Sequence, residues 1–337
     1  MNIIVAILLF GFIVFVHELG HFLFAKKAGV RVHEFAIGMG PKIFTTQKGE
    51  TSYSIRALPI GGFVSMEGED ETSNDPRSLE QKTILQRASI MFAGPFFNII
   101  LTILLFIPVF FVMGVPSDSN VLGEIQKNSP AYEAGLKQGD KIVEIDNIKT
   151  DSWEEIVNTL STKTDKKPVS IEVERDGNIK EYDITPQKGE DGRYVIGIVP
   201  QYEKSFLNAI ISSFTVTIDM IKQMLVFLFQ LVTGTLSGEA ADSVAGPIGV
   251  LGIVSDAAST GIINVIYIGA VISLNLGVMN LLPIPALDGG RLFFLGIEAI
   301  RGKKMNPEKE IMINNIGFIL LMAFMLFVTY KDIIRLF

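Results

Sequence analysis

Apolar and polar stretches alternate along the chain in a pattern that predicts membrane-spanning helices. Four apolar runs are each long enough to cross about 30 Å of hydrocarbon as a helix, namely residues 3–25, 89–115, 262–287 and 311–330. Lys26 and Lys27 follow the first run directly, and positive charge at the end of a span favours the cytosolic side. The pattern therefore predicts four spans, with both termini outside the cytosol.

A β-hairpin is predicted between the first two spans. Residues 51–66 (TSYSIRALPIGGFVSM) alternate apolar and polar side chains, as a strand with one buried face does. The alternation breaks at residues 59–62, where Pro and Gly favour a turn, and then resumes. Two roles fit this hairpin: it packs on the cytosolic side and does nothing more, or it offers a strand edge to a peptide by β-augmentation.

Residues 116–203 differ in character and predict a separate soluble domain. The expected strands are residues 121–125, 141–146, 169–175 and 182–185. Residues 152–160 predict a helix, in which Ser152 is the N-cap and Glu155 completes a capping box three residues later. A segment of this length suffices for one small core.

The segment that follows this domain is apolar but interrupted by polar side chains. Residues 205–236 show helical periodicity, yet they contain two charged residues and two glutamines. A helix of this kind is typical of the membrane interface, so we expect it to lie there rather than to cross. The resulting division is an N-terminal membrane part (1–115), a soluble domain (116–203), an interfacial amphipathic region (204–261) and a C-terminal membrane part (262–337).

Composition supports a membrane protein and excludes several kinds of site. The 337 residues are 48% hydrophobic and only 19% charged, and their mean hydropathy is +0.40. A net charge of −7 gives no basic face for nucleic acid. Cysteine is absent, which excludes thiolate nucleophiles and cysteine-ligated metals, and there are only three histidines.

Two of those histidines lie in the first apolar run, in the sequence HELGH. His17 and His21 are four residues apart, so on a helix they share one face and can bind one cation together. Glu18 would lie near the open coordination position, where it could take a proton from a water molecule. The alternative is a pair of core histidines bonded to backbone carbonyls. That alternative is weakened here, because ionisable groups inside a membrane are costly and usually mark function.

A metal site needs a third ligand from elsewhere in the chain. The third histidine of the metzincin pattern would fall at Lys27, and His33 lies beyond the first span in a polar segment. A better candidate is Asp288 in NLLPIPALDGG, where two prolines interrupt the apolar run. Non-helical backbone at membrane depth is tolerated where it lines a cavity. Asp288 could instead be the N-cap of the following helix, and both roles could coexist.

Sidedness gives an independent check on this pairing. Spans one and three must run in the same direction for HELGH and Asp288 to meet at one depth. Residues 205–236 therefore cannot add a single extra crossing, which agrees with an interfacial location.

HELGH in the first span and NLLPIPALDGG in the penultimate one together resemble the site-2 protease family of intramembrane zinc metalloproteases, in its PDZ-containing bacterial branch. The resemblance covers essentially the whole chain. It implies one Zn²⁺ per chain, held by His17, His21 and Asp288, with Glu18 as catalytic base. It also implies a re-entrant β-hairpin beside HELGH. The substrate-contacting residues implied in this way are Gly61, Gly62, Phe63, Asn275 and Asn280; the alternative for the two asparagines, above all for Asn275, is hydrogen bonding between helices.

The soluble domain is similar to bacterial PDZ domains through SPAYEAGLKQGDKIVEIDN (129–147). A peptide would then bind between the strand at 121–125 and the helix at 152–160. The groove residues expected are Leu122, Gly123, Ile125, Trp153 and Ile156. Such a domain could also act only as a size filter. FAGPFFN (92–98) and AGPIGV (245–250) look like family motifs too, without a chemical role beyond close packing at Gly.

The sequence thus predicts an α-helical polytopic membrane protein with four transmembrane helices, a re-entrant β-hairpin and one extracytoplasmic PDZ-like α+β domain. The implied activity is hydrolysis of peptide bonds within or near transmembrane segments, for example in anti-sigma factors or signal-peptide remnants. The implied location is a bacterial cell membrane, with the site toward the cytosol. The alternatives are a transporter that uses the same His/Glu/Asp cluster, for which no inverted repeat is found, and a non-catalytic PDZ scaffold.

Overall fold

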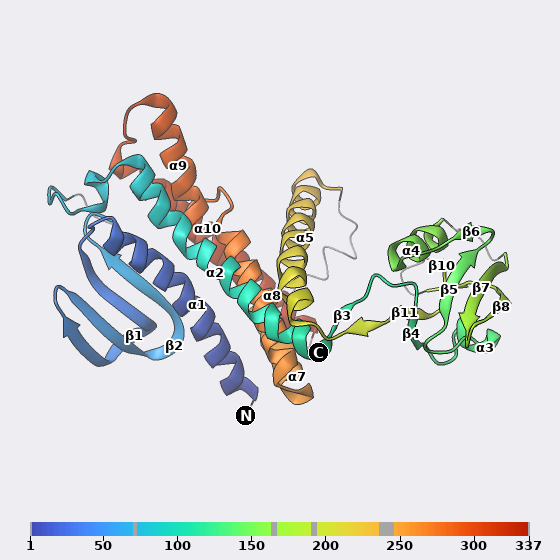
Figure 1. Cartoon of the computed structure of the whole chain (residues 1–337). Helices are drawn as coiled ribbons and strands as arrows, with labels where there is room; N and C mark the ends of the chain where they lie inside the picture. Colours follow the sequence, from blue (N-terminus) through green and yellow to red (C-terminus); the bar gives the residue numbers. More distant parts are fainter. Residues whose placement is uncertain (1, 70–72, 163–166, 190–193, 236–245, 336–337) are drawn as a thin grey trace. The chain divides into compact units, whose positions relative to one another are not determined.

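The computed structural model describes residues 2–69, 73–162, 167–189, 194–235 and 246–335, and the statements below refer to these (Figure 1). The chain forms two compact units. The membrane unit comprises Met1–Val109 and Ile210–Phe337, and the PDZ-like unit comprises Phe110–Ala209. Residues 236–245, part of the predicted interfacial region, lie outside the described residues.

Helices make up most of the membrane unit. They are α1 (Asn2–Lys27), α2 (Ile84–Met113), α5 (Phe206–Thr233), α7 (Pro247–Thr260), α8 (Ile262–Asn280), α9 (Asp288–Arg301) and α10 (Pro307–Arg335). Among the described residues, five of them, α1, α2, α5, α8 and α10, are long and apolar enough to cross a membrane. The chain is therefore a polytopic helical membrane protein.

Helices α1, α2 and α8 pack closely enough to fix their relative heights. A Cβ at Gly269 of α8 would lie 2.8 Å from Leu9 of α1. The hydroxyl of Thr102 in α2 donates to the carbonyl of Ala270 in α8 at 3.1 Å. Leu9 precedes His17 in α1 and Gly269 precedes Asn280 in α8, and His17 and Asn280 line one pocket, so both helices run in the same direction toward it.

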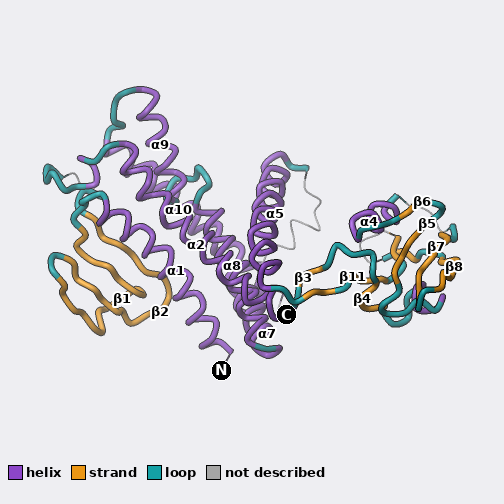
Figure 2. The backbone as a smooth tube through the Cα atoms, viewed as in Figure 1, coloured by secondary structure: helices purple, strands orange, loops and turns teal. Residues whose placement is uncertain are grey.

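A small sheet packs beside the half of α1 that carries HELGH (Figure 2). It consists of β1 (Val32–Lys48) and β2 (Thr51–Met66), two long and irregular strands. The ring of Phe35 in β1 contacts Phe15 and Phe22 of α1, with centroids 5.8 and 5.1 Å apart. Aromatic pairs of this geometry add to the burial that holds the sheet against the helix.

The predicted pairing within residues 51–66 is wrong. The arms of that segment do not pair with each other; residues 62–66 pair with residues 32–37, which also pair with residues 52–55. The tight hairpin is the one that joins β1 to β2, in which Lys48 pairs with Thr51. Alternation in a sequence shows that a strand has two unlike faces but does not identify its neighbour, so the pairing could not be derived from it.

Helix α5 is the one candidate span that was not predicted to cross. It is a single helix of 28 residues, and only 6% of its most apolar 18-residue stretch is buried. Long exposed side chains such as Phe206, Phe214 and Phe229 lie along it. Length and hydropathy give five candidate spans where the sequence pattern predicted four.

The PDZ-like unit has its own core, built by an antiparallel sheet and two helices. The sheet has the order β6–β5–β7–β8, from β5 (Lys141–Ile145), β6 (Ile148–Lys149), β7 (Val169–Arg175) and β8 (Asn178–Ile184). The helices are α3 (Pro130–Ala134) and α4 (Trp153–Ser161), and Ser152 caps α4 as predicted by accepting a hydrogen bond from the Glu155 amide. Short strands complete the unit: β3 (Val115–Pro116), β4 (Leu122–Ile125), β9 (Gln187–Lys188), β10 (Tyr194–Val195), β11 (Ile198–Pro200) and β12 (Tyr202–Glu203).

The predicted peptide-receiving strand, Leu122–Ile125, forms β4 in the structure. As β4 it pairs with β11 on one side. On its other side the Leu122 amide donates to the Asp140 carbonyl, and the Leu122 carbonyl accepts from the Gly139 amide, both at 2.8 Å. A Cβ at Gly123 would lie 2.1 Å from the Pro200 carbonyl. At Leu122 both edges of β4 therefore have backbone partners, and for the residues after it the peptide-receiving role stays a prediction.

Candidate active site

HELGH lies on α1, one face of which is buried against α2 and the sheet. His17 and His21 are each 7% exposed, as expected for side chains one turn apart on the inner face. Glu18 is on the adjoining face and lines the same pocket. The pocket lies next to β2, because a Cβ at Gly62 would be 3.3 Å from the Glu18 Cγ. Glycine at 62 therefore lets β2 approach the carboxylate closely.

Asp288 reaches this level because the chain leaves the helical path after α8. Helix α8 ends at Asn280, and α9 begins at Asp288, so residues 281–287 form a non-helical link that contains both prolines. Ala286 in this link has a left-handed φ of 76°, and its amide donates to Oδ1 of Asn314 in α10 at 3.2 Å. The N-cap of α9 is Leu287, without a side-chain cap hydrogen bond. The Asp288 carboxylate instead faces the two histidines.

Three ligand atoms from these residues form a nearly equilateral triangle. Nε2 of His17 lies 3.2 Å from Nε2 of His21, and both face Oδ2 of Asp288, at 3.2 Å and 3.5 Å. A tetrahedral zinc ion with ligands at 2.0–2.1 Å has neighbouring ligand atoms about 3.3 Å apart. The residues therefore fit one face of a zinc tetrahedron, with two imidazoles and one carboxylate as donors. Among the described residues this is the one group of His, Asp and Glu that could hold a metal ion.

A pocket opens over this triangle. Its lining comes from α1, β2 and the loop after it, α2, α8, the link before α9, and α9 itself. The residues are His17, Glu18, His21, Phe63, Val64, Met66, Glu69, Met91, Asn280, Ala286, Leu287, Asp288 and Arg291. Phe63, Val64 and Met66 form the part of the wall that β2 supplies. The guanidinium of Arg56 stacks on the Phe63 ring, 4.7 Å from its centroid, and holds that ring in place.

Helix α2 supports His21 from behind. The Nδ1 of His21 lies 2.8 Å from the Ile90 carbonyl, so Nδ1 carries the hydrogen and Nε2 is left free to bind a cation. Gly94, one turn further along α2, makes room for the ring, since a Cβ there would be 2.2 Å from the His21 Nε2. The motif FAGPFFN thus supplies the surface against which the HELGH helix rests.

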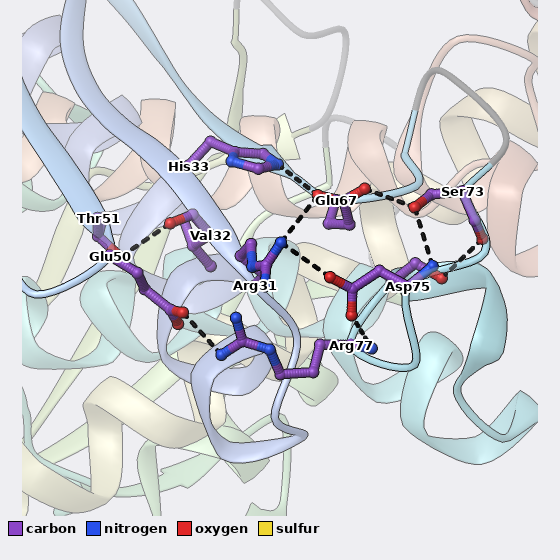
Figure 3. A network of polar contacts seen from close by, with 10 residues as sticks. Arg31, Val32, His33, Glu50, Thr51, Glu67, Ser73, Asp75 and Arg77 are labelled. Carbon is purple, nitrogen blue, oxygen red and sulfur yellow. Dashed lines mark hydrogen bonds and ion pairs between the residues drawn. The ribbon is translucent and has the colours of Figure 1, made fainter.

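Gly61, Gly62 and Asn275, which were predicted to contact substrate, lie outside the pocket lining, as does His33. Asn275 is exposed on α8, while Asn280 lines the pocket. His33 belongs to a polar network at the end of α1, where its Nε2 is 2.9 Å from Oε2 of Glu67 (Figure 3). Hydrogen bonds from Ser73 and from His33 hold the pKa of Glu67 below its usual range against the opposing effect of desolvation.

The same network ties the sheet to the loop that follows it. Arg31 pairs with Asp75 at 2.8 Å, and Arg77 pairs with Glu50 at 2.7 Å (Figure 3). This loop carries Glu69, whose carboxylate accepts a hydrogen bond from Arg291, one turn after Asp288 in α9. Sequence reasoning missed Glu69, Arg291, Met91 and Asn314. Only the charges of the first two could have drawn attention, and nothing in the sequence indicated that they meet.

The chain was also compared with known protein families, proteins and structures. The model of peptidase family M50 matches residues 5–324. The chain is 36% identical to the regulator of sigma-W protease RasP of Bacillus subtilis, over all of this chain and 99% of that one, and 35% identical to the zinc metalloprotease RasP of Geobacillus kaustophilus, over all of this chain and 98% of that one. It is 41% identical to a Clostridium acetobutylicum protein, over 99% of this chain and 97% of that one. A Listeria monocytogenes PDZ-domain crystal structure aligns with 26% of this chain and 90% of its own, at 25% identity and a TM-score of 0.23.

Proposed function

Since the chain belongs to peptidase family M50, we propose that it is a site-2-type intramembrane zinc metalloprotease that hydrolyses peptide bonds within or beside transmembrane segments. The resemblance to site-2 proteases is confirmed by the family match. The observation that supports the activity most strongly is the triangle of His17, His21 and Asp288 ligand atoms beside Glu18, inside an apolar helix bundle.

The residues of the chain divide the chemistry among them. His17, His21 and Asp288 hold the ion, which when bound polarises a carbonyl and lowers the pKa of water toward neutrality. Glu18 accepts the proton of the attacking water and returns it to the leaving amine. Asn280, at the end of α8 on the pocket wall, donates its amide hydrogens to the substrate backbone or to the developing oxyanion.

Strand 62–66 gives the substrate a place to bind in an extended form. A transmembrane helix must be unwound before hydrolysis, because its carbonyls are engaged in i to i−4 hydrogen bonds. This strand lines the pocket through Phe63 and Val64 and pairs with residues 32–37 on one side. An unwound substrate segment would add to it by β-augmentation, with Gly61 and Gly62 permitting a close approach.

The sheet has the surface of an element that enters the membrane. The end distant from α1 exposes Met39, Ile43, Phe44, Ile55 and Leu58, each between 50% and 71%. A cluster of this kind on a water-facing sheet would be an aggregation hazard, whereas in lipid it lowers the free energy. We therefore propose that β1 and β2 form a re-entrant sheet.

Four crossings fit the described helices best. Helices α1 and α8 run in the same direction toward the site, and α2 returns between them. The segment from the end of α2 to the start of α8 must then begin and end on one side, so α5 either lies in the interface or crosses and is followed by a return. The Lys pair after HELGH supports a topology with the site toward the cytosol, and with the PDZ-like unit and both termini outside, in a bacterial cell membrane.

A peptide at the PDZ-like unit would add either to β4 after Leu122 or to β11. Among the described residues, β11 pairs with β4 alone, and its Ile198 packs on the same core as Trp153 and Ile156 of α4.

The B. subtilis relative is named for regulation of sigma-W. We propose membrane-bound anti-sigma factors or signal-peptide remnants as the substrate class of this chain.

The test is cleavage of a single-span model substrate by purified protein in detergent, with products identified by mass spectrometry. Glu18→Gln should lower kcat by roughly 100- to 10,000-fold, the usual contribution of a positioned base. Glu69→Gln removes a second carboxylate of the same pocket, one already bonded to Arg291, and should retain most of the activity. Equal cleavage by native protein and Glu18→Gln would refute the proposal.

A further inference from the structure

A buried asparagine on α2 stands behind His17, the other metal-binding histidine. Asn98 is 0% exposed. It follows Ile90 and Gly94 at intervals of four residues, so the three lie along one face of α2. Ile90 bonds to His21 and Gly94 admits its ring. Asn98 completes this stripe, because its side-chain amide lies 3.3 Å from Nδ1 of His17.

The geometry of the ligand triangle determines which nitrogen of His17 carries the hydrogen. The Nε2 of His17 faces Asp288 and His21, so it supplies the lone pair for the metal. A neutral imidazole that binds through Nε2 has its hydrogen on Nδ1 and needs an acceptor there. For His21 the acceptor is the Ile90 carbonyl. For His17 the group at hydrogen-bond distance is the carboxamide of Asn98.

We propose that Asn98 is a positioning residue for the metal centre, whose Oδ1 accepts the Nδ1 hydrogen of His17 when the ion is bound. In the structure, Nδ2 is the atom that faces His17, while Oδ1 is buried without a partner among the described residues. A half-turn about the last side-chain bond exchanges two groups of nearly equal shape. After this exchange Oδ1 faces His17, and the NH₂ group takes the position without a partner. Metal binding through Nε2 of His17 requires a hydrogen on Nδ1, and that hydrogen favours the orientation in which Oδ1 accepts it.

The backbone of Asn98 is itself fixed by α8. Its carbonyl accepts hydrogen bonds from the hydroxyl groups of Thr102 and Ser273, both at 2.9 Å. Ser273 lies on the helix that leads to Asp288. The residue that orients His17 is therefore bonded to the element that delivers the third ligand, which links the two halves of the metal site.

This inference rests on the proposed zinc site and is tested by zinc affinity, measured in detergent by competition with a chelator of known affinity. Asn98→Leu keeps the shape but removes the acceptor, and it should weaken zinc binding by about 10- to 100-fold, as loss of an outer-shell partner does. Asn98→Asp keeps an acceptor and should stay within a few-fold of the native affinity. Asn264→Leu is the matched control, since it makes the same substitution in the same unit at a residue whose amide donates to Thr260 and which is not part of the pocket lining.

A second measurement needs no variant. With only three histidines, the ¹⁵N-histidine spectrum of the zinc-loaded protein resolves each ring, and His17 should show a hydrogen-bonded Nδ1–H and a metal-bound Nε2. Metal bound through Nδ1 of His17 would overturn the inference. Native affinity in Asn98→Leu, or an equal loss in Asn264→Leu, would also overturn it while leaving the zinc site intact. Absence of zinc binding in the native protein would refute the zinc site as well.

Discussion

Gly94 offers a sharp test of how closely α2 backs the metal site. In Gly94→Ala the new Cβ would lie 2.2 Å from Nε2 of His21, where ordinary contact begins at 3.4 Å. The His21 ring or the helix must move by the difference, 1.2 Å. Zinc–ligand distances tolerate only about 0.2 Å, so the displacement cannot be absorbed within the bond.

The magnitude follows from the strain. Overpacking of this kind costs about 1–3 kcal/mol, which corresponds to roughly 5- to 150-fold in zinc affinity if it is relieved by moving His21 away from the ion. The assay is chelator competition in detergent together with thermal unfolding. Gly296→Ala is the control, because Gly296 also lies inside a helix but a Cβ there would contact nothing within 4 Å. It should leave zinc affinity unchanged and stabilise α9 by up to about 1 kcal/mol. Native zinc affinity in Gly94→Ala would refute the packing described for α1 and α2.

Three further changes test other parts of the structure. In the PDZ-like unit, desolvation raises the pKa of Asp140, but hydrogen bonds from Arg175 and the Lys137 amide outweigh it and lower that pKa below its usual value. The ionised Asp140 should therefore stabilise the folded unit above about pH 4, and this contribution should be lost as the pH falls through the folded-state pKa. Asp140→Asn should cost about 3 kcal/mol by leaving Arg175 unpaired, measured by urea unfolding through the fluorescence of the single tryptophan, which lies in α4; an unchanged midpoint would contradict it. Ala286→Val should weaken zinc binding, because a β-branched residue resists the left-handed φ found two positions before Asp288. Ala286→Gly should retain the native zinc affinity, and equal affinities of the two variants in chelator competition would contradict the prediction. Phe63→Ala should raise KM more than it lowers kcat, since Phe63 forms the wall along which substrate binds; steady-state kinetics on the model substrate would exclude that role if only kcat changed.

Local spacing was enough to predict part of the site. The i, i+4 relation of His17 and His21 is a property of any α-helix, so their shared face followed from the sequence alone. The location of Asp288 beside them could be predicted only because a site with two histidines lacks a ligand and because the two motifs occur together. The structure shows how the link after α8 brings Asp288 to the histidines: Ala286 has a left-handed φ, and its amide donates a hydrogen bond to Asn314.

Features that depend on pairing between distant segments could not be predicted. Residues 51–66 had the pattern of strands, but the partner of each arm, residues 32–37, is set by packing on α1. The strand at Leu122 had a similar ambiguity: β4 and β11 pair with each other, and among the described residues neither has a second strand partner. Asn98 belongs to a motif that was noticed, but its contact with His17 depends on how α2 crosses α1.

The central claim is that α1 and the link before α9 together hold one zinc ion. The most direct measurement is zinc K-edge X-ray absorption on the purified protein, with zinc counted per chain in the native protein and in Asp288→Ala. The account predicts one zinc per native chain, with only nitrogen and oxygen neighbours at about 2.0–2.1 Å and two imidazoles among them, and a large loss of zinc from Asp288→Ala. Full retention of zinc by Asp288→Ala, or a native spectrum without histidine scattering, would contradict it.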